Sequence, residues 1–361
     1  MCIRDSTHSE DEIDIEDLIA DQQMVIAITK SGYIKSLPLS TYRQQHRGGV
    51  GVTGMDMKDD DYIEHLFVAS THDYILFFTT VGKVYRLKVH ELPLGSRQSK
   101  GRAIVNLLPL RQDELIRAVI ATRNFEEAKY LVFATKKGIV KKTQFLEYNT
   151  PLKADGIIAL KMREDDELIG VRLSDGEDDI LMVSRMGQAV RFSEKDVRSM
   201  GRPASGVAGM KLRAGDEVIE VDIASDDADL LVVTENGWGK RTRVSEYPVK
   251  GRGTMGVKTV QLVEAKGRLA GARIVRDGYQ VMLISDGGTV IRMATDGIKR
   301  SGRATQGVIV MRLREGETVS SLAPVIGADE EDGPELPEIL EASEVSEVPE
   351  AAPEAPGADG S

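Results

Sequence analysis

The sequence has one cysteine, few aromatic residues and no long apolar run. A single cysteine, Cys2, cannot form a disulfide framework, which favours a reducing cytoplasm. The first residues are acidic and polar, unlike a secretory signal peptide, and no segment approaches the roughly 20 apolar residues that a membrane helix needs. Aromatic residues make up 5% of the chain whereas glycines number 35, which is typical of β structure rich in turns.

The common motifs of enzymes are also missing. The sequence has no Walker-type phosphate loop, no His-Glu-x-x-His zinc motif, no paired-cysteine metal site and no Gly-x-Ser-x-Gly elbow. Its five histidines are scattered without ligand spacing. Residues 251–256, GRGTMG, match a dinucleotide fingerprint, but the strand-like GVKTVQL follows where that fingerprint needs a helix. We therefore expect no catalytic residue, metal site or cofactor in this chain.

A regular series of glycine pairs is present instead. The second glycine of each pair follows the first after 18 or 19 residues, and successive pairs begin about fifty residues apart. An apolar β run ends three positions before each first glycine, which predicts a strand, a tight turn with positive φ and a second strand. Six such units predict an all-β, propeller-like array. The pairs are Gly32 and Gly51, Gly82 and Gly101, Gly138 and Gly156, Gly187 and Gly206, Gly237 and Gly256, and Gly288 and Gly307.

Basic residues recur at two positions of this unit. A single one is typical of a solvated surface charge, but a repeat fold places one sequence phase at one location on every blade. We therefore expect rings of cations that bind a polyanion. Four residues after the first glycine lie Arg86, Lys142, Arg191, Arg241 and Arg292, with Ser36 beside Lys35 in the first unit. Four residues before the second glycine lie Arg47, Arg97, Arg202, Arg252 and Arg303, and the third unit has Lys153 one place further along.

The charge of the chain is divided between its ends and its body. The net charge is −11, yet residues 326–361 contain twelve acids and no base, and residues 1–21 contain eight acids against Arg4. Residues 22–325 therefore carry a net charge of +8, which is compatible with nucleic acid. The tail, rich in Glu, Pro and Ala, is predicted to be disordered, either as a solubility tail or as an arm that competes with DNA. We expect an unrelated or disordered segment 1–12, a repeat domain 13–325 and the tail 326–361.

One segment of the first unit resembles a known family. Residues 45–51, QHRGGVG, are similar to the box Gln-basic-Arg-Gly-Gly-basic-Gly of the C-terminal domain of the DNA gyrase A subunit. His46 and Val50 replace its usual Arg or Lys, and the resemblance covers about residues 13–325. It implies a six-bladed β-pinwheel whose blades exchange strands and which wraps duplex DNA with positive handedness, so that ATP-dependent gyrase introduces negative supercoils. The matching residues are Gln45, Arg47, Gly48, Gly49 and Gly51.

The resemblance also implies a division of labour. The catalytic tyrosine lies in the N-terminal region of the A subunit, and ATP hydrolysis with its Mg belongs to the B subunit, in a cytoplasmic, nucleoid-associated A2B2 holoenzyme. DNA contacts are then expected from residues 45–51, His46 included, and from the phased cations. About ten phosphate contacts predict a salt slope near −9. Two alternatives stay open: the corresponding domain of topoisomerase IV, and a propeller-type scaffold for protein interactions.

Overall fold

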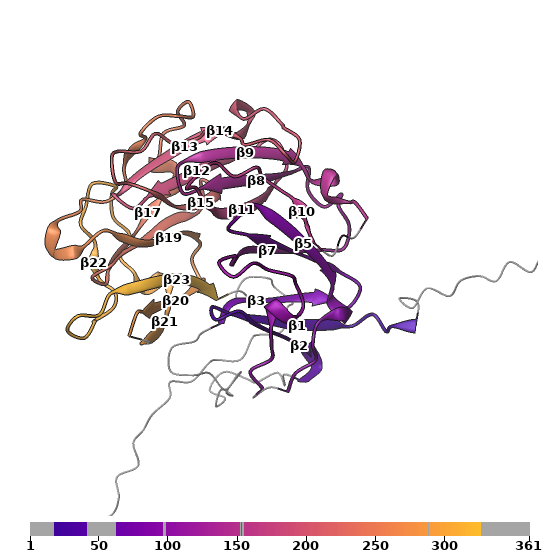
Figure 1. Cartoon of the computed structure of the whole chain (residues 1–361). Coiled ribbons are helices and arrows are strands. Elements are labelled where there is room, and N and C mark those ends of the chain that lie inside the picture. Colours follow the sequence, from indigo (N-terminus) through magenta and orange to yellow (C-terminus); the bar gives the residue numbers. More distant parts are fainter. Residues whose placement is uncertain are drawn as a thin grey trace, which may run out of the picture.

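The computed structural model describes residues 18–41, 63–96, 99–151, 153, 155–287 and 289–325. These residues form antiparallel β-sheets and short 3-10 helices, which Figure 1 shows around a common centre. The predicted all-β fold is confirmed. None of the helices in this part of the chain has the length and hydrophobicity that a bilayer-spanning helix requires.

Each complete blade has an inner strand, a central hairpin and a two-residue strand from the following unit. The first blade has the order β3 (Ile63–Ser70), β1 (Gln23–Thr29), β2 (Tyr33–Pro38) and β6 (Arg102–Ala103). The second has β7 (Ile116–Thr122), β4 (Tyr74–Thr79), β5 (Lys83–Lys88) and β10 (Ile157–Ile158). The third has β11 (Leu168–Ser174), β8 (Tyr130–Thr135), β9 (Ile139–Gln144) and β14 (Val207–Ala208).

The remaining blades follow the same plan. The fourth has β15 (Val218–Ala224), β12 (Asp179–Ser184), β13 (Gln188–Ser193) and β18 (Val257–Lys258). The fifth has β19 (Leu269–Val275), β16 (Asp229–Thr234), β17 (Trp238–Arg243) and β22 (Val308–Ile309). The sixth has β23 (Val319–Val325), β20 (Gln280–Ser285) and β21 (Val290–Ala294) within the described ranges. The 3-10 helices are η2 (Leu39–Thr41), η3 (Val89–Glu91), η4 (Ile104–Asn106), η5 (Phe145–Tyr148), η6 (Glu194–Asp196), η7 (Val244–Glu246), η8 (Glu264–Lys266) and η9 (Thr295–Gly297).

The glycine pairs mark the hairpin turn and the crossing between blades. Each described first glycine has a φ between 75° and 82°, and in the first blade the Gly32 amide donates to Thr29 O at 2.9 Å to close the turn. The second glycines allow close backbone approach. A Cβ on Gly256, which has a φ of 70°, would lie 2.1 Å from the carbonyl oxygen of Ala189 on β13. The strand exchange between blades that the resemblance implied is seen beside this contact, where β18 pairs with β13 of the preceding blade.

The hydrophobic core is divided into clusters that lie between successive blades. Between the second and third blades, the rings of Phe78 and Phe133 meet edge to face with centroids 5.6 Å apart, and Phe145 is buried beside them. The inner strands contact one another in the order β3, β7, β11, β15, β19 and β23, and β23 contacts β3. The ring of inner strands therefore closes, and the second to fifth blades are covered by a neighbouring blade on both faces.

The inner strands carry a half-buried cluster of charged side chains. Arg172 Nη2 donates to Glu220 at 2.7 Å, and Arg172 Nε donates to Asp222 at 3.0 Å. Burial, together with the positive charges of Arg273 and Arg172, lowers the pKa of His65 to about 4. His65 is therefore neutral at pH 7, and acid is expected to weaken the ring from its centre.

Candidate nucleic-acid interface

In the second to sixth units, the segment between the 3-10 helix that follows the hairpin and the second glycine crosses to the preceding blade over the outer edge of its sheet. We call these segments the crossing loops. They comprise residues 92–101, 149–156, 197–206, 247–256 and 298–307, of which residues 97, 98, 152 and 154 lie outside the described ranges. Each leads into a two-residue strand that pairs with the second strand of the preceding hairpin, β2, β5, β9, β13 or β17. We call these second hairpin strands the outer strands. The outer strands and the crossing loops together form the rim of the propeller.

Four predicted cations lie on successive crossing loops of the third to sixth units. Lys153 and Arg252 are exposed, and Arg202 and Arg303 are half-buried. Two hydrogen bonds to the preceding unit orient the Arg252 side chain. Its Nε donates to Asp196 O at 2.9 Å, and its Nη1 donates to Ala208 O at 3.0 Å. Each of these four loops therefore carries one of the predicted cations, and their contact with DNA stays a prediction.

Three cations of the other phase lie between blades and have protein partners. Arg241 is 5% exposed; its Nε donates to Ile298 O at 3.0 Å, and its Nη1 lies 2.6 Å from an oxygen of Asp277. The buried Lys142 ammonium contacts both the carbonyl oxygen and the carboxylate of Glu194, at 2.8 and 3.4 Å. Ile298 and Glu194 belong to the next blade in sequence, and Asp277 lies in the link between the fifth and sixth blades.

Arg191 repeats this arrangement in the fourth blade. Its guanidinium bonds to Asp179 on β12 and to Asp226, which follows β15, and its Nη1 donates to Val244 O of the fifth unit at 3.3 Å. Burial opposes the charged form, but the hydrogen bonds to Asp226 and Asp179 outweigh it and raise the pKa of Arg191. A phosphate could reach Lys142, Arg191 or Arg241 only by displacing the acceptors that already compensate these buried cations, which is costly. We therefore correct the predicted role of these three residues: they connect neighbouring blades.

The other two cations of this phase, Arg86 and Arg292, are half-buried. Arg86 lies 4.6 Å from the ring centroid of Tyr74, and its Nη2 donates to Thr150 O at 2.6 Å. Burial lowers its pKa, but the guanidinium stays charged because an arginine starts from a very high value. Its Nη1 has no hydrogen-bond partner among the described residues, nor has the Nε of Arg292.

Arg86 and Lys153 line one small cavity between the second and third blades. The cavity has a volume of about 20 Å³ and is also lined by Thr150 and Gly156. It is large enough for one water-sized group. A single phosphate oxygen entering here would meet a cation from each phased series, so the structure brings together two residues that are 67 positions apart.

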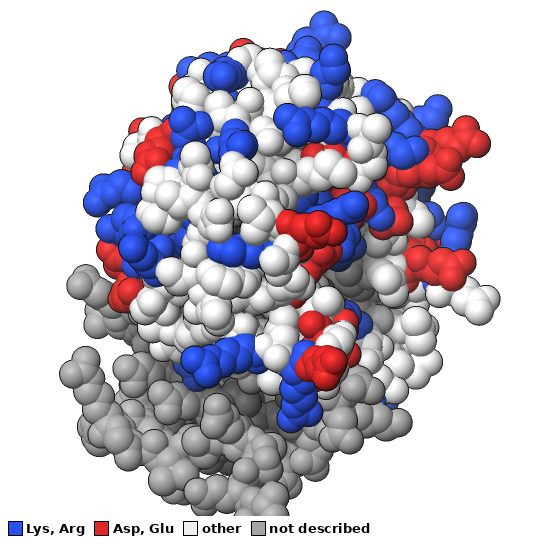
Figure 2. All heavy atoms as spheres, turned by 90° about the vertical axis from the view of Figure 1, so that its left-hand side faces the viewer, with Lys and Arg blue, Asp and Glu red and all other residues white. Residues whose placement is uncertain are grey.

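Figure 2 shows the surface over the left-hand side of Figure 1, where β17 and β22 lie. Lys and Arg side chains form patches along the left edge and across the top of this face, whereas most Asp and Glu side chains lie on the right. Residues 45–51, Arg97 and Gly288 lie outside the described ranges, as do the segment 1–12 and the tail 326–361.

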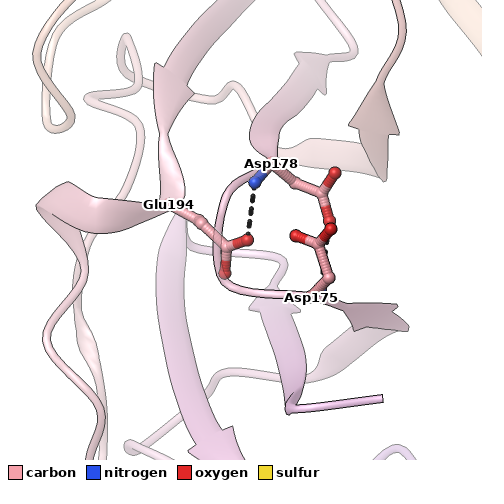
Figure 3. A group of neighbouring side chains, drawn as sticks. All are labelled: Asp175, Asp178 and Glu194. Atoms are coloured by element: carbon pink, nitrogen blue, oxygen red, sulfur yellow. Dashed lines mark hydrogen bonds between the residues drawn. The ribbon is translucent and has the colours of Figure 1, made fainter. Parts of the chain in front are cut away.

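A group of carboxylates at the junction of the third and fourth units is shown in Figure 3. Asp175, Asp178 and Glu194 lie around one turn, and Glu194 accepts a hydrogen bond of 2.8 Å from the Asp178 amide. The other oxygen of Glu194 accepts from Ser174 Oγ and lies 3.4 Å from the Lys142 ammonium. Both oxygens of Glu194 are thus engaged by protein donors, and we assign no metal to this cluster.

Sequence reasoning missed a third set of basic residues, Lys35, Lys141 and Lys240. All three are fully buried on outer strands, three positions after the first glycine. Their common phase was visible in the sequence, but nothing in the alternation of a strand indicates that a lysine points inward.

Repeated hairpin blades, exchanged two-residue strands and cations on the crossing loops define a six-bladed β-propeller with basic residues on its rim. Each of its six units matches the family model described as DNA gyrase C-terminal domain, beta-propeller. The chain therefore belongs to this family. The matched ranges are residues 23–70, 73–123, 129–175, 178–225, 228–276 and 279–326.

Individual relatives agree with this assignment. The DNA gyrase A subunit of Halalkalibacterium halodurans is 51% identical over 323 residues, which cover 90% of this chain and 39% of that protein. The chain thus spans about two fifths of the length of this relative. A crystal structure of the C-terminal domain of DNA topoisomerase IV has a TM-score of 0.74 at 28% identity, covering 85% of this chain and 94% of that one. A structure of a DNA gyrase A C-terminal domain has a TM-score of 0.67 at 26% identity, covering 84% and 100%.

Proposed function

We propose that this chain binds double-stranded DNA along the rim of its propeller and bends it into a wrap of positive handedness. The wrap would present a nearby segment of the same DNA to a strand-passage gate, so that a gyrase holoenzyme introduces negative supercoils. The observation that carries this proposal is the placement of one of the predicted cations on each of four successive crossing loops. Membership of the gyrase family supports it.

The energy of DNA bending explains why the cations must be repeated. Bending a short duplex by 90° costs up to about 6 kcal/mol, so a full turn costs on the order of 20 kcal/mol. Two or three phosphate contacts cannot offset this cost, whereas contacts repeated around a rim can. Contacts to the DNA backbone carry no base code, so we expect a weak sequence preference that follows bendability.

Eight of the predicted cations remain as proposed phosphate contacts after the three buried ones are set aside. With eight contacts the logarithm of the affinity should fall against the logarithm of salt with a slope of about −7. In segment 45–51 the glycines would let backbone amides approach a phosphate, with Gln45 and His46 beside the forked Arg47. The eight cations are Arg47, Arg86, Arg97, Lys153, Arg202, Arg252, Arg292 and Arg303.

The chemistry of strand passage is assigned to other parts of a larger enzyme. We propose that the partners are the N-terminal region of the A subunit, which holds the catalytic tyrosine, and the B subunit, which uses ATP and Mg. In this A2B2 holoenzyme the present chain supplies DNA geometry, with no catalytic residue or cofactor of its own. The site of action is the cytoplasm, at the nucleoid.

A second candidate is favoured by one specific observation. The likeness to the topoisomerase IV domain has the higher TM-score of the two, 0.74 against 0.67 for the gyrase domain. A function of that type predicts DNA binding without strong wrapping, so affinity alone does not separate the two functions. The handedness of the bound DNA does.

DNA binding itself is tested by equilibrium titration of a linear duplex over a range of salt concentrations. The wild type should give a slope of about −7, and a variant with Arg252→Ala and Arg303→Ala about −5, because each lost phosphate contact changes the slope by about one. Arg213→Ala is the matched control, because Arg213 is exposed but lies outside the crossing loops. No binding at low salt, or an equal change in the control, would contradict the proposal.

A further inference from the structure

Three buried lysines occupy the same place in alternate blades. Lys35, Lys141 and Lys240 lie on β2, β9 and β17 of the first, third and fifth blades, and their exposed fractions are 1%, 0% and 0%. An ammonium group is expensive to bury unless its protons are bonded. The second, fourth and sixth blades have Tyr85, Val190 and Ile291 at this place. A blade can therefore be built without the lysine, and its presence calls for another reason.

Each lysine bonds to backbone carbonyl groups in the crossing loop of the next unit. Lys141 Nζ donates to Arg202 O at 2.6 Å, and also to Ala159 O at 2.6 Å. Lys240 Nζ donates to Arg303 O at 2.6 Å and to the neighbouring Gly302 O at 2.7 Å. The acceptors thus include the main chain of the two residues whose side chains are proposed to meet phosphate.

Lys35 makes the equivalent contact in the first blade. Its Nζ donates to Ser99 O at 2.9 Å and to Ser96 O at 3.3 Å, in the crossing loop of the second unit. A lysine thus bonds to crossing-loop carbonyl groups at the same position of three repeats, which indicates a structural role for this lysine in the repeat.

The surroundings of Lys141 and Lys240 are also repeated. Around Lys141 lie Glu147, Tyr148 and Arg202; Tyr148 Oη donates to Ala159 O at 3.1 Å, and Glu147 accepts from the Arg202 amide at 3.2 Å. The corresponding charged and titratable groups around Lys240 are Glu246, Tyr247 and Arg303, and the Arg303 guanidinium lies 5.9 Å from the centroid of the Tyr247 ring.

We propose that Lys141 and Lys240 are positioning residues whose buried ammonium groups fix the crossing loops that present Arg202 and Arg303 to DNA. Lys35 fixes the crossing loop of the second unit in the same way. The hold on these loops then depends on pH in the neutral range, because the two lysines lose a proton there. This inference rests on the proposed function for its DNA readout, but the loop geometry can be tested without DNA.

Titration of the two lysines supports this dependence. Burial, only partly offset by Glu147, lowers the pKa of Lys141 to about 7, and burial likewise lowers the pKa of Lys240 to about 8. The ammonium is present below these values and is lost as pH rises through them. A neutral amine still has two protons, one for each of the two carbonyl acceptors of Lys141 and of Lys240, and it removes the cost of burying a charge. A loop that opens exposes a lysine of ordinary, higher pKa and takes up a proton, so the loops should become harder to open as pH rises from about 6.5 to 9.

The crossing loop 247–256 serves as an internal control. The residue beneath it on the fourth blade is Val190, which has no proton to donate or lose. Hydrogen exchange of the whole chain, corrected for the intrinsic effect of pH, should show about tenfold more protection in loops 197–206 and 298–307 at pH 9 than at pH 6.5. Loop 247–256 should keep its protection. Equal changes in all three loops, or none, would overturn the inference.

The effect on DNA is tested with a double variant, Lys141→Met and Lys240→Met. Methionine keeps much of the length and the apolar stem of lysine, and thermal unfolding confirms that the variant folds. Its affinity for a linear duplex at pH 6.5 should be about tenfold lower than that of the wild type, equivalent to about 1.4 kcal/mol. It should also lose the part of the pH dependence that the wild type shows between pH 6.5 and 9.

Lys129→Met is the control for loss of a surface charge, because Lys129 is exposed and lies outside the crossing loops. It should keep the wild-type pH profile. A double variant with wild-type affinity and pH profile would refute the role of the lysines. Absence of DNA binding by the wild type would instead refute the proposed function, while hydrogen exchange would still decide whether the lysines hold the loops.

Discussion

Two arginines of the fifth unit should respond to substitution in opposite ways. Arg241 on β17 is 5% exposed and connects its blade to the sixth, whereas Arg252 is exposed on the crossing loop of the same unit. We expect Arg241→Ala to lower the free energy of unfolding and leave DNA affinity unchanged at temperatures where the protein is folded. Arg252→Ala should lower DNA affinity and leave stability nearly unchanged.

The magnitude for Arg241 follows from its partners. The buried carbonyl of Ile298 loses its donor, which costs about 1–3 kcal/mol. Asp229 is 2% exposed and loses one arginine but keeps Arg300 at 2.8 Å, so the cost stays below the roughly 3–5 kcal/mol of an abandoned buried charge. Asp277 is 67% exposed and contributes little. The total is about 3 kcal/mol, or a fall in the unfolding temperature of about 5 °C.

Calorimetry and a salt titration of DNA binding measure both quantities for both variants. Arg252→Ala should shift the unfolding temperature by no more than about 1 °C, as for most surface substitutions, and reduce the salt slope by about one. If Arg241→Ala weakened DNA binding as much as Arg252→Ala while the protein remained folded, the assignment of Arg241 to the contact between blades would be wrong.

Three further predictions concern the backbone, the centre of the ring and the tail. Gly256→Ala should cost at least about 2 kcal/mol in denaturant unfolding, because its φ is 70° and its Cβ would meet Ala189 O; Gly251→Ala, with open space around it, is the neutral control. Since the folded pKa of His65 is lowered from 6.5 to about 4, the wild type should lose up to about 3 kcal/mol as pH falls through that interval. His65→Gln should flatten this loss, and equal acid sensitivity would exclude His65 as its source. Truncation after Val325 removes twelve acids and should tighten DNA binding at low salt; an unchanged affinity would reject a competing arm.

The hairpins could be predicted from the sequence because their signals are local. An apolar β run and a glycine three positions later define one turn, and six repetitions define the blades. The exchanged strands could not be derived in this way, because β14 or β18 has two residues and shows no periodicity. Their partners lie about 70 residues away and are selected by the close approach of backbone at glycines such as Gly256.

The positions of the basic residues within the repeat could be predicted from the sequence, but their burial could not. Alternation along β17 cannot reveal that both of its faces are covered by neighbouring blades, so Arg241 and Lys240 look like surface residues in the sequence. The acidic partner of Arg241, Asp277, lies 36 positions away, in a turn that the sequence presents as a solvated loop. The crossing-loop cations, by contrast, lie where the repeat placed them, because a glycine-bounded loop on a rim has few ways to be buried.

Ligation of a nicked circular plasmid in the presence of the whole chain tests the proposed wrapping most directly. After the protein is removed, the linking number of the closed circles reports how the DNA was bent while bound. We expect a positive shift that grows with the ratio of protein to DNA. Binding without any shift would contradict wrapping and favour the topoisomerase IV type of function, and absence of binding at low salt would leave a scaffold for protein interactions.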